Sequence, residues 1–433
     1  MKPKQIYIEC TPTYSTDILT GIQRVVRNVI YEANIVSSEL SVQVIPVIFQ
    51  GGHCYALESS VFDKHHDHSI SSNLLSRLLK SRHVISIKDW LRRYASFVFV
   101  LARKMYLYLQ LKIKSSEASL QDVRFHGGDI LLLLDGAWGR PIEKEVTSAR
   151  TSGAKVIFCL YDIIPVSHSN FCDPVKTADF KKFLKDMLML ADGVMCISKA
   201  VENELIAYQK NIFPQLKTTP LIDYFHLGVD RENLSSNGNV REEVAIVFQD
   251  KSPVFLMVST IEPRKNHAFL LDVFERLWSQ NHQVLLVFVG RVGWEVKELM
   301  RRIDLHPKRD SLFFVFHDLN DAELSYCYSH ATSLLFPSFA EGFGLPIIEA
   351  LEHGLPVIAS NIPVHREIGK NLLMYIDPNE PETLMTRVLK ILQNEKVDER
   401  YIPNGFQWMN WKEATRELIR KLLVMSSQLE EKK

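Results

Sequence analysis

The chain alternates short, nearly continuous apolar runs with segments whose apolar residues recur at helical spacing. The runs of the first half are KQIYIEC, SVQVIPVIF, GDILLLLDG, AKVIFCLYD and ADGVMCIS, and those of the second half are SPVFLMVST, QVLLVFVG, LFFVFHD, ATSLLFPS and LPVIAS. A parallel strand that is buried on both faces reads as such a run, and the crossovers between parallel strands need helices. The alternation therefore predicts α/β architecture, with parallel sheets covered by helices on both faces.

The 433 residues suggest two or three domains rather than one. Residues 231–243, RENLSSNGNVREE, form a polar break between the two sets of strands. We expect two doubly wound, Rossmann-like domains at 1–234 and 240–404, facing each other across a cleft. Residues 405–433 are amphipathic, and we expect a final helix there that packs back on the N-terminal domain. Ligands of such sheets bind at the carboxyl ends of the strands.

The amino-acid composition limits the kinds of molecule that we expect the protein to bind and the compartment in which we expect it. Formal net charge is zero, so no global field recruits nucleic acid or membrane, and we expect no nucleic-acid partner. The six cysteines form no CxxC pair, and several lie in apolar runs, as is typical of reduced packing cysteines in a cytoplasmic protein. No run approaches the roughly 20 apolar residues that a membrane-spanning helix needs.

One basic segment fits neither domain, and we treat it as an insertion at about 73–114. Residues 77–114 hold ten Lys or Arg against one acid, Asp89, with Trp90 and several Tyr and Phe between them. Two interpretations remain open. The segment is either an interfacial surface for an anionic membrane, on the inner face of the cytoplasmic membrane, or a helical insertion with a solvated basic face.

Metal-binding patterns are weak. His65, His66 and His68 lie in a polar segment without a partner motif, which favours a solvated loop over a metal site. The chain holds no Asp-x-Asp, the motif that metal-dependent transferases of another fold usually carry. We therefore expect neither a metal nor any other cofactor.

The stretch FAEGFGLPIIEA, residues 339–350, predicts a helix with an anion site at its start. Pro346 suits the first turn of a helix, and Gly354 suits the position after its end, so we expect a helix over 346–353. Gly342 and Gly344 allow a ligand to approach the backbone. Free N–H groups at the start of a helix then favour a phosphate.

Two acids flank this predicted phosphate site. Glu349 lies one turn into the helix, where its carboxylate can accept hydrogen bonds from the two hydroxyls of a ribose. Glu341 lies before the loop, on the side where a sugar would follow the phosphates. Phosphate, ribose and sugar in line make a sugar nucleotide. The alternative is that both acids only complement the dipole of the helix.

A basic pair follows the first strand of the second half. In STIEPRKNH, Arg264 and Lys265 stand at the expected carboxyl end of that strand. A guanidinium and an ammonium could together neutralise a diphosphate leaving group. The alternative is an exposed basic turn, which is common for any such pair.

Long stretches resemble the family 4 glycosyltransferases, which are retaining enzymes of the two-domain GT-B fold. STIEPRKNHAFLLDVFERL, LLVFVGRVGWEVKEL, FPSFAEGFGLPIIEALEHGLPVIASN and MYIDP occur in the usual order of the family and cover most of residues 255–380. The first half resembles bacterial surface-polysaccharide and O-antigen mannosyltransferases of this family in TGIQRVVRNVI, GDILLLLDGAW, VIFCLYDIIP and CISKAVENEL.

The resemblance implies roles where the motifs match. Catalytic roles fall to Glu341 near the donor sugar, to Arg264 and Lys265 at the diphosphate, and to Asp162 of YDIIP near the acceptor. Donor binding falls to Gly21, Arg264, Lys265, Glu349 and the backbone N–H groups of Phe343, Gly344 and Leu345. Where the family often carries histidine before that aspartate, this chain has Tyr161, so a contact that the histidine would make is in question.

The implied reaction is transfer of a hexose from a nucleotide sugar to a glycan hydroxyl with retention at the anomeric carbon. Mannose from GDP-mannose is the favoured donor group, and a polyprenyl-diphosphate-linked glycan is the expected acceptor. Three alternatives remain open. They are a rhamnosyl- or other hexosyltransferase that uses a dTDP- or UDP-sugar, a sugar-nucleotide epimerase of the same fold, and a non-catalytic scaffold that binds nucleotide sugars.

Overall fold

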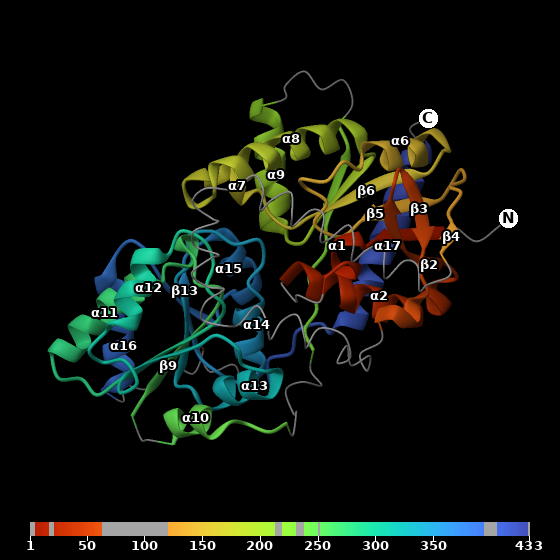
Figure 1. Ribbon diagram of the computed structural model, residues 1–433. Helices are drawn as coiled ribbons and strands as arrows, with labels where there is room; N and C mark the ends of the chain where they lie inside the picture. The colour runs from red at the N-terminus through yellow and green to blue at the C-terminus, as the bar shows by residue number, and fades with distance from the viewer. Residues whose placement is uncertain are drawn as a thin grey trace, which may run out of the picture.

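The computed structural model describes residues 5–16, 21–62, 120–212, 219–230, 238–249, 252–393 and 405–431. The chain forms two α/β lobes, one from the first half and one from the second (Figure 1). The basic segment 77–114, the histidines at 65–68 and most of the polar break at 231–243 lie outside the described residues.

The N-terminal lobe is built on one sheet with the strand order β4-β3-β2-β1-β5-β6-β7-β8. Its strands are β1 (Gln5–Glu9), β2 (Gln43–Gln50), β3 (His53–Ala56), β4 (Gln121–Asp122), β5 (Ile130–Leu133), β6 (Lys155–Leu160), β7 (Gly193–Cys196) and β8 (Leu221–Tyr224). The six strands from β2 to β8 in this order pair in parallel, as predicted. The strands β3 and β4 add an antiparallel edge that the apolar runs did not predict.

Helices cover both faces of this sheet. They are α1 (Thr11–Tyr14), α2 (Gly21–Leu40), α6 (Glu143–Thr151), α7 (Ile164–Ser167), α8 (Pro174–Leu190) and α9 (Lys199–Ile212), with short 3-10 turns η1 (Ser59–Phe62) and η2 (Ser169–Phe171). Successive residues of β1 point to opposite faces, so Ile6 and Ile8 pack with α2 while Tyr7 packs in the core on the other side. This two-sided burial is why the strand reads as a continuous apolar run.

The C-terminal lobe has a wholly parallel sheet with the order β11-β10-β9-β12-β13-β14. Its strands are β9 (Val254–Val258), β10 (Leu285–Val289), β11 (Phe313–Phe316), β12 (Ser333–Phe336), β13 (Val357–Ser360) and β14 (Leu373–Ile376). The order reverses between β9 and β12, and in the other lobe it reverses between β1 and β5. Crevices at such reversals are where open α/β sheets bind ligands.

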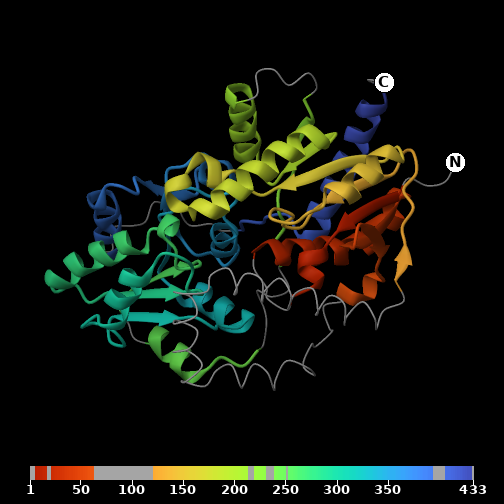
Figure 2. The same ribbon diagram turned by 45° about the horizontal axis from the view of Figure 1, so that its top comes forward.

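The helices of this lobe are α11 (His267–Ser279), α12 (Lys297–Asp304), α13 (Asp321–His330), α14 (Leu345–Glu352), α15 (Pro363–Gly369) and α16 (Pro381–Leu392). The short elements α10 (Glu242–Ala245), η4 (Ile246–Phe248) and η5 (Pro263–Lys265) complete it. Figure 2 shows strands of this sheet as green and teal arrows that point the same way, with helices of the lobe beside them. Among the described residues, no helix is long and apolar enough to cross a bilayer.

The last helix, α17 (Trp411–Glu431), returns to the N-terminal lobe and lies against α2 (Figure 1). Arg416 Nη2 pairs with Glu39 Oε2 of α2 at 2.7 Å, and Lys421 Nζ pairs with Asp223 Oδ1 of β8 at 3.0 Å. The apolar face of α17, including Leu418 and Leu422, is buried in the same core as β1. The predicted return of a C-terminal helix to the N-terminal domain is therefore confirmed.

Helix α14 begins one residue earlier than the sequence predicted. Its N-cap is Gly344, whose φ of 114° is a conformation that side chains rarely adopt, and Leu345 is the first helical residue. The helix ends at Glu352, and Gly354 follows in the left-handed region with φ 72°. The two glycines thus define the helix from both ends.

Candidate functional site

A cavity of about 680 Å³ lies between the two lobes. Its walls come from the loops after β1, β5 and β6 in one lobe and after β9 and β12 in the other, which are the carboxyl ends of strands beside both order reversals. Eight of the nine predicted site residues line it, namely Gly21, Asp162, Arg264, Lys265, Glu341, Phe343, Gly344 and Leu345. Glu349 does not, and it lines a smaller neighbouring cavity instead.

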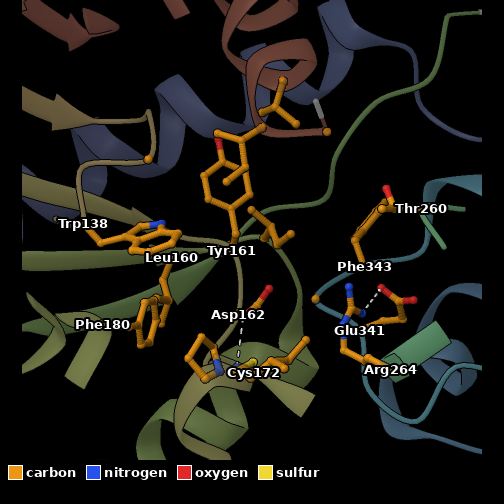
Figure 3. Close-up of a pocket in the computed structure, with 18 of the residues that line it drawn as sticks. Trp138, Leu160, Tyr161, Asp162, Cys172, Phe180, Thr260, Arg264, Glu341 and Phe343 are labelled. Carbon is orange, nitrogen blue, oxygen red and sulfur yellow. Dashed lines mark hydrogen bonds and ion pairs between the residues drawn. The ribbon is translucent and has the colours of Figure 1, made fainter. Parts of the chain in front are cut away.

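The carboxylate of Glu341 holds both predicted basic residues. Glu341 Oε2 accepts a hydrogen bond from Arg264 Nη1 at 2.8 Å (Figure 3), and Glu341 Oε1 accepts one from Lys265 Nζ. Arg264 Nη2 also donates to Glu262 Oε1 at 2.6 Å. The side chains of Glu341, Lys265 and Arg264 are only 8%, 12% and 17% exposed, so the alternative of an exposed basic turn is excluded.

Burial and charge oppose each other in this cluster. Burial by itself would raise the pKa of Glu341, but Arg264 and Lys265 outweigh it and hold the pKa far below its usual range. Burial lowers the pKa of Lys265, and the neighbouring Arg264 lowers it further, while Glu341 opposes both. The cluster therefore places the basic side chains of Arg264 and Lys265 against the carboxylate of Glu341 where little water reaches.

The start of α14 presents unused backbone donors to the cavity. Among the described residues, the N–H groups of Phe343, Gly344 and Leu345 donate to no other group, and all three residues line the cavity. The dipole of the helix and these N–H groups together favour an anion at this point. The cations of Arg264 and Lys265 line the same cavity, so a diphosphate would be neutralised from both sides.

The lobes touch directly at Gly342. A methyl group added to this residue would lie 2.1 Å from the carbonyl oxygen of Tyr161 and 3.3 Å from Cβ of Asp162, both in the other lobe. Gly342 O also accepts a hydrogen bond from Ser198 Oγ at 2.8 Å. A glycine is therefore required here because the backbones of the two lobes meet, which the sequence did not indicate.

A second contact between the lobes is electrostatic. Glu367 of α15 accepts hydrogen bonds from the N–H groups of Lys199 and Ala200 at 2.8 and 2.7 Å, at the first turn of α9. His226 Nε2 lies 2.7 Å from the same carboxylate. Burial opposes this arrangement, but these contacts lower the pKa of Glu367 overall. The acid thus caps a helix of the opposite lobe.

The neighbouring residues Tyr161 and Asp162 point in different directions. Tyr161 donates its hydroxyl to Leu134 O at 2.9 Å, inside the N-terminal lobe. Asp162 lies at the edge of the cavity and accepts a hydrogen bond from Ile164 N at 3.0 Å on Oδ1 (Figure 3). Burial raises the pKa of Asp162, and Arg264 across the gap lowers it in part. Asp162 is thus the predicted acceptor-side residue that faces the basic cluster.

Gly21, the first residue of α2, also lines the cavity. A methyl group added there would meet nothing within 4 Å.

Glu349 is already paired in the structure. Its Oε1 accepts a hydrogen bond from Arg24 Nη1 of α2 at 2.9 Å, and its Oε2 accepts one from Tyr328 OH at 2.9 Å. Arg24 Nη2 also lies 3.6 Å from Asp230 Oδ2. The small cavity around these side chains has a volume of only about 40 Å³. The predicted ribose acid is therefore held by a cation of the other lobe.

Three further cavity residues escaped the sequence analysis. Asp135 follows β5, where its carboxylate accepts hydrogen bonds from the N–H groups of Thr13 and Gly136, both at 2.7 Å. Burial, with Glu9 nearby, raises the pKa of Asp135 to about 6. Trp138 lies in the same loop and lines the same cavity, whereas Arg24, one turn into α2, lines the smaller cavity around Glu349. Asp135 and Trp138 could have been predicted from their location in the sequence, because an acid and an aromatic residue there follow a buried strand.

No group of three or more His, Cys, Asp or Glu side chains within the described ranges is arranged to hold a metal ion.

Two facing Rossmann-like lobes with the ligand cavity between them define the GT-B fold of glycosyltransferases. HepE of Anabaena, solved with UDP and glucose, aligns over 99% of both chains with a TM-score of 0.53 and 13% identity. Sucrose-phosphate synthase of Thermosynechococcus elongatus aligns over 99% of this chain and 98% of its own with a TM-score of 0.54 and 15% identity.

Sequence comparison identifies the family of the second lobe. Residues 241–408, most of the second lobe, match the family model for glycosyl transferases group 1. The serotype-specific mannosyltransferase WbdA of Escherichia coli is 28% identical over 367 residues, which is 82% of this chain and 44% of the relative. The O-antigen chain mannosyltransferase RfbU of Salmonella typhimurium is 34% identical over 175 residues, which is 40% of this chain and 48% of the relative. The chain thus spans less than half the length of these curated relatives.

Proposed function

We propose that the protein is a retaining glycosyltransferase that moves a hexose from a nucleotide sugar to a hydroxyl of a glycan acceptor. The observation that carries the proposal is the buried cluster of Arg264, Lys265 and Glu341 beside the free N–H groups of α14. Such a set of donors and cations suits a diphosphate whose charge grows as it leaves.

The donor would lie along the cavity in a fixed order. Its diphosphate would accept hydrogen bonds from Phe343, Gly344 and Leu345 and would draw Arg264 and Lys265 from their pairing with Glu341. Glu341 would then be free to accept a hydrogen bond from the hexose. The ribose would lie toward Glu349, where its hydroxyls would replace Arg24.

In the proposed transfer step, all bonds and the proton are accounted for without a metal ion or a separate general base. The bond from the anomeric carbon to the diphosphate oxygen breaks, and the acceptor oxygen bonds that carbon from the same face. The proton of the acceptor hydroxyl passes to the departing phosphate oxygen. Electrostatic stabilisation of the diphosphate by Arg264 and Lys265 is the main contribution expected from the protein.

For the particular substrates we infer mannose carried on GDP, and a polyprenyl-diphosphate-linked glycan of a surface polysaccharide as acceptor. The mannosyltransferase relatives WbdA and RfbU support the choice of hexose. An acceptor of this kind would bring the enzyme to the inner face of the cytoplasmic membrane as a peripheral protein, with the basic segment 77–114 as the expected contact.

The test is incubation of the purified protein with GDP-mannose, UDP-glucose and dTDP-rhamnose, each with a lipid-linked glycan. Release of nucleoside diphosphate together with a glycan heavier by one hexose supports transfer. The donor that reacts identifies the nucleobase that the protein prefers. Interconversion of the nucleotide sugar without glycan growth would indicate an epimerase. Binding of a nucleotide sugar without either reaction would indicate a scaffold.

A further inference from the structure

The large cavity has two chemically different ends. The end formed by the C-terminal lobe holds the charged cluster around Glu341. The end formed by the N-terminal lobe is walled by Trp138, Phe180 and Phe183, with Leu160 beside them. Figure 3 shows the labelled members of this wall on the side of the cavity away from Arg264 and Glu341, with Asp162 between the two groups.

One face of α8 supplies most of this wall. Lys176, Phe180 and Phe183 are spaced by four and then three residues, so they form a single stripe along the helix, and all three line the cavity. Asp173 fixes the start of the helix, since its Oδ1 accepts hydrogen bonds from Val175 N and Lys176 N at 2.9 and 3.0 Å. The cap stabilises the turn of α8 that carries the first residue of the stripe.

The aromatic rings are packed against one another. Trp138 meets Phe180 edge to face at 6.3 Å between ring centroids, with an interplanar angle of 74°. Phe180 lies 6.4 Å from Phe183, and Phe183 lies 6.2 Å from Phe158 of β6. Such contacts hold Trp138 in one orientation while the inner rings complete the core.

Trp138 differs from the rings beneath it because it is left open. The residue Trp138 is 39% exposed, whereas Phe180 is 6% exposed. Its indole nitrogen lies beside Gly136, and no residue within the described ranges accepts a hydrogen bond from it. The residue therefore offers a ligand one flat apolar face and one unused donor.

These features match a pyranose ring better than an isoprenoid chain or a phosphate. A pyranose has an apolar face of C–H groups, which suits the negative face of an aromatic ring, and an edge of hydroxyls that needs polar partners. Polar partners are present, because Asp135, Asp162, Asp173 and Lys176 line the same cavity as the aromatic wall. A channel for a lipid chain would be apolar along its whole length.

We propose that Trp138 is the stacking platform of an acceptor subsite that binds a pyranose ring, with Phe180 and Phe183 as its support. This inference rests on the proposed glycosyl transfer and adds to it that the acceptor group entering the cavity is a sugar rather than a bare lipid phosphate. Asp162, between the platform and the charged cluster, is the acid nearest to the route by which an acceptor hydroxyl reaches the donor.

The test compares Trp138→Ala and Trp138→Phe with the wild type, using octyl α-D-mannopyranoside as the sugar probe and farnesyl phosphate as the lipid probe. Saturation-transfer NMR on GDP-loaded protein measures binding without turnover. We expect transfer to the pyranose protons in the wild type and in Trp138→Phe, and at least tenfold weaker mannoside binding in Trp138→Ala. GDP affinity should stay unchanged in both variants, which also shows that they are folded.

Unchanged mannoside binding in Trp138→Ala would overturn the proposal, as would displacement of the mannoside by equimolar farnesyl phosphate. Where a glycan acceptor is turned over, the variant should raise KM for the acceptor and leave KM for the nucleotide sugar as it is. Failure of the proposed function would look different, because the wild type would then transfer no hexose even though the mannoside binds at Trp138.

Discussion

Arg24 and Glu349 are 325 residues apart in the sequence, and their side chains form an ion pair of 2.9 Å between the two lobes. Glu349 is the acid predicted to bind the ribose of the donor. A nucleotide that uses this carboxylate therefore has to displace the guanidinium. Arg24 keeps a second partner, Asp230 at 3.6 Å, to which it can remain bound after displacement.

This competition predicts opposite effects of two conservative substitutions on GDP binding. Glu349→Gln should weaken it by about 2 kcal/mol, because charge-assisted hydrogen bonds to the ribose are lost. Arg24→Gln should strengthen it by up to about 1 kcal/mol, roughly fivefold, the value of a partly exposed ion pair that no longer has to be broken. Isothermal titration with GDP measures both. Weaker binding in Arg24→Gln would show that Arg24 contacts the nucleotide instead of competing with it.

The basic pair should act on turnover more than on binding. Arg264→Ala and Lys265→Ala remove charges that matter most when the diphosphate departs, so each should lower kcat by at least about tenfold, which is about 1.4 kcal/mol, with a smaller change in KM for the donor. Steady-state kinetics with the reactive nucleotide sugar checks this. Arg276→Ala, which removes a surface ion pair with Glu382, is the matched control. An effect confined to KM would mean that Arg264 and Lys265 only hold the ground-state donor.

The close contact at Gly342 predicts that adding a single methyl group to this residue would push the two lobes apart. Gly342→Ala would place Cβ 2.1 Å from Tyr161 O, so either the loop or the whole lobe has to shift. We expect turnover to fall by at least about tenfold, since small misplacements of reacting groups are costly. Small-angle scattering should show a larger radius of gyration. Gly127→Ala, with nothing within 4 Å of the added methyl, should change neither quantity. Full activity of Gly342→Ala would contradict the assigned contact.

Two buried histidines near the donor end predict a loss of stability in acid. Burial lowers the pKa of His365 to about 4 and that of His267 to about 3, from an ordinary value of 6.5. Between pH 6.5 and about 4 the unfolded chain therefore binds protons that the folded chain does not. As the pH is lowered across this window, the free energy of unfolding should therefore decrease by up to about 1.4 kcal/mol per pH unit for each histidine.

Thermal unfolding at pH 7 and pH 5 tests this with His365→Gln. The variant should show a smaller drop in Tm between the two pH values than the wild type, even if its Tm at pH 7 is lower. His330→Gln, at an exposed position on α13, serves as the control and should keep the full drop. An equal drop in wild type and His365→Gln would mean that His365 is not buried as a neutral ring.

Much of the fold could be predicted from the sequence because the strands are buried on both faces. The runs around β9, β10 and β12 read as strands since all of their residues except Val258 are buried. The edge strand β8 is half-buried, and the strands β3 and β4 at the other side of the sheet have only four and two residues, so none of the three gives a periodic signal. Short strands of this kind take their place from the neighbours with which they pair.

Some features of the candidate site could be predicted from the sequence, and others could not. Residues within one loop, such as Glu341 and Gly344, could be placed because the start of a helix fixes their neighbourhood. The pairing of Arg24 with Glu349 and the contact of Gly342 with Tyr161 depend on how two lobes meet. No local pattern encodes that relation. Trp138 was missed for the same reason, because an aromatic in a loop gains meaning only from the cavity that it faces.

The basic segment 77–114 lies outside the described residues, and its prediction therefore stands on sequence alone. With ten Lys or Arg against one acid, it should bind anionic vesicles at low salt and release them at high salt. Each basic residue near the surface contributes about 1 kcal/mol. Replacing Arg92, Arg93, Arg103 and Lys104 with Ser should release the protein and leave activity on a soluble acceptor intact. No sedimentation of the wild type with anionic vesicles at low salt would favour the packed insertion.

Retaining transfer is the central claim, and the anomeric configuration of the product tests it most directly. The measurement is a proton NMR time course of GDP-mannose, whose mannose is α-linked, with the purified protein and a glycan acceptor. We expect the anomeric signal of the donor to decay while an α-mannoside signal of the elongated glycan grows at the same rate, and we expect Lys265→Ala to slow both. A β-linked product, a change of the sugar within the nucleotide, or no consumption of any nucleotide sugar in the presence of acceptor would contradict it.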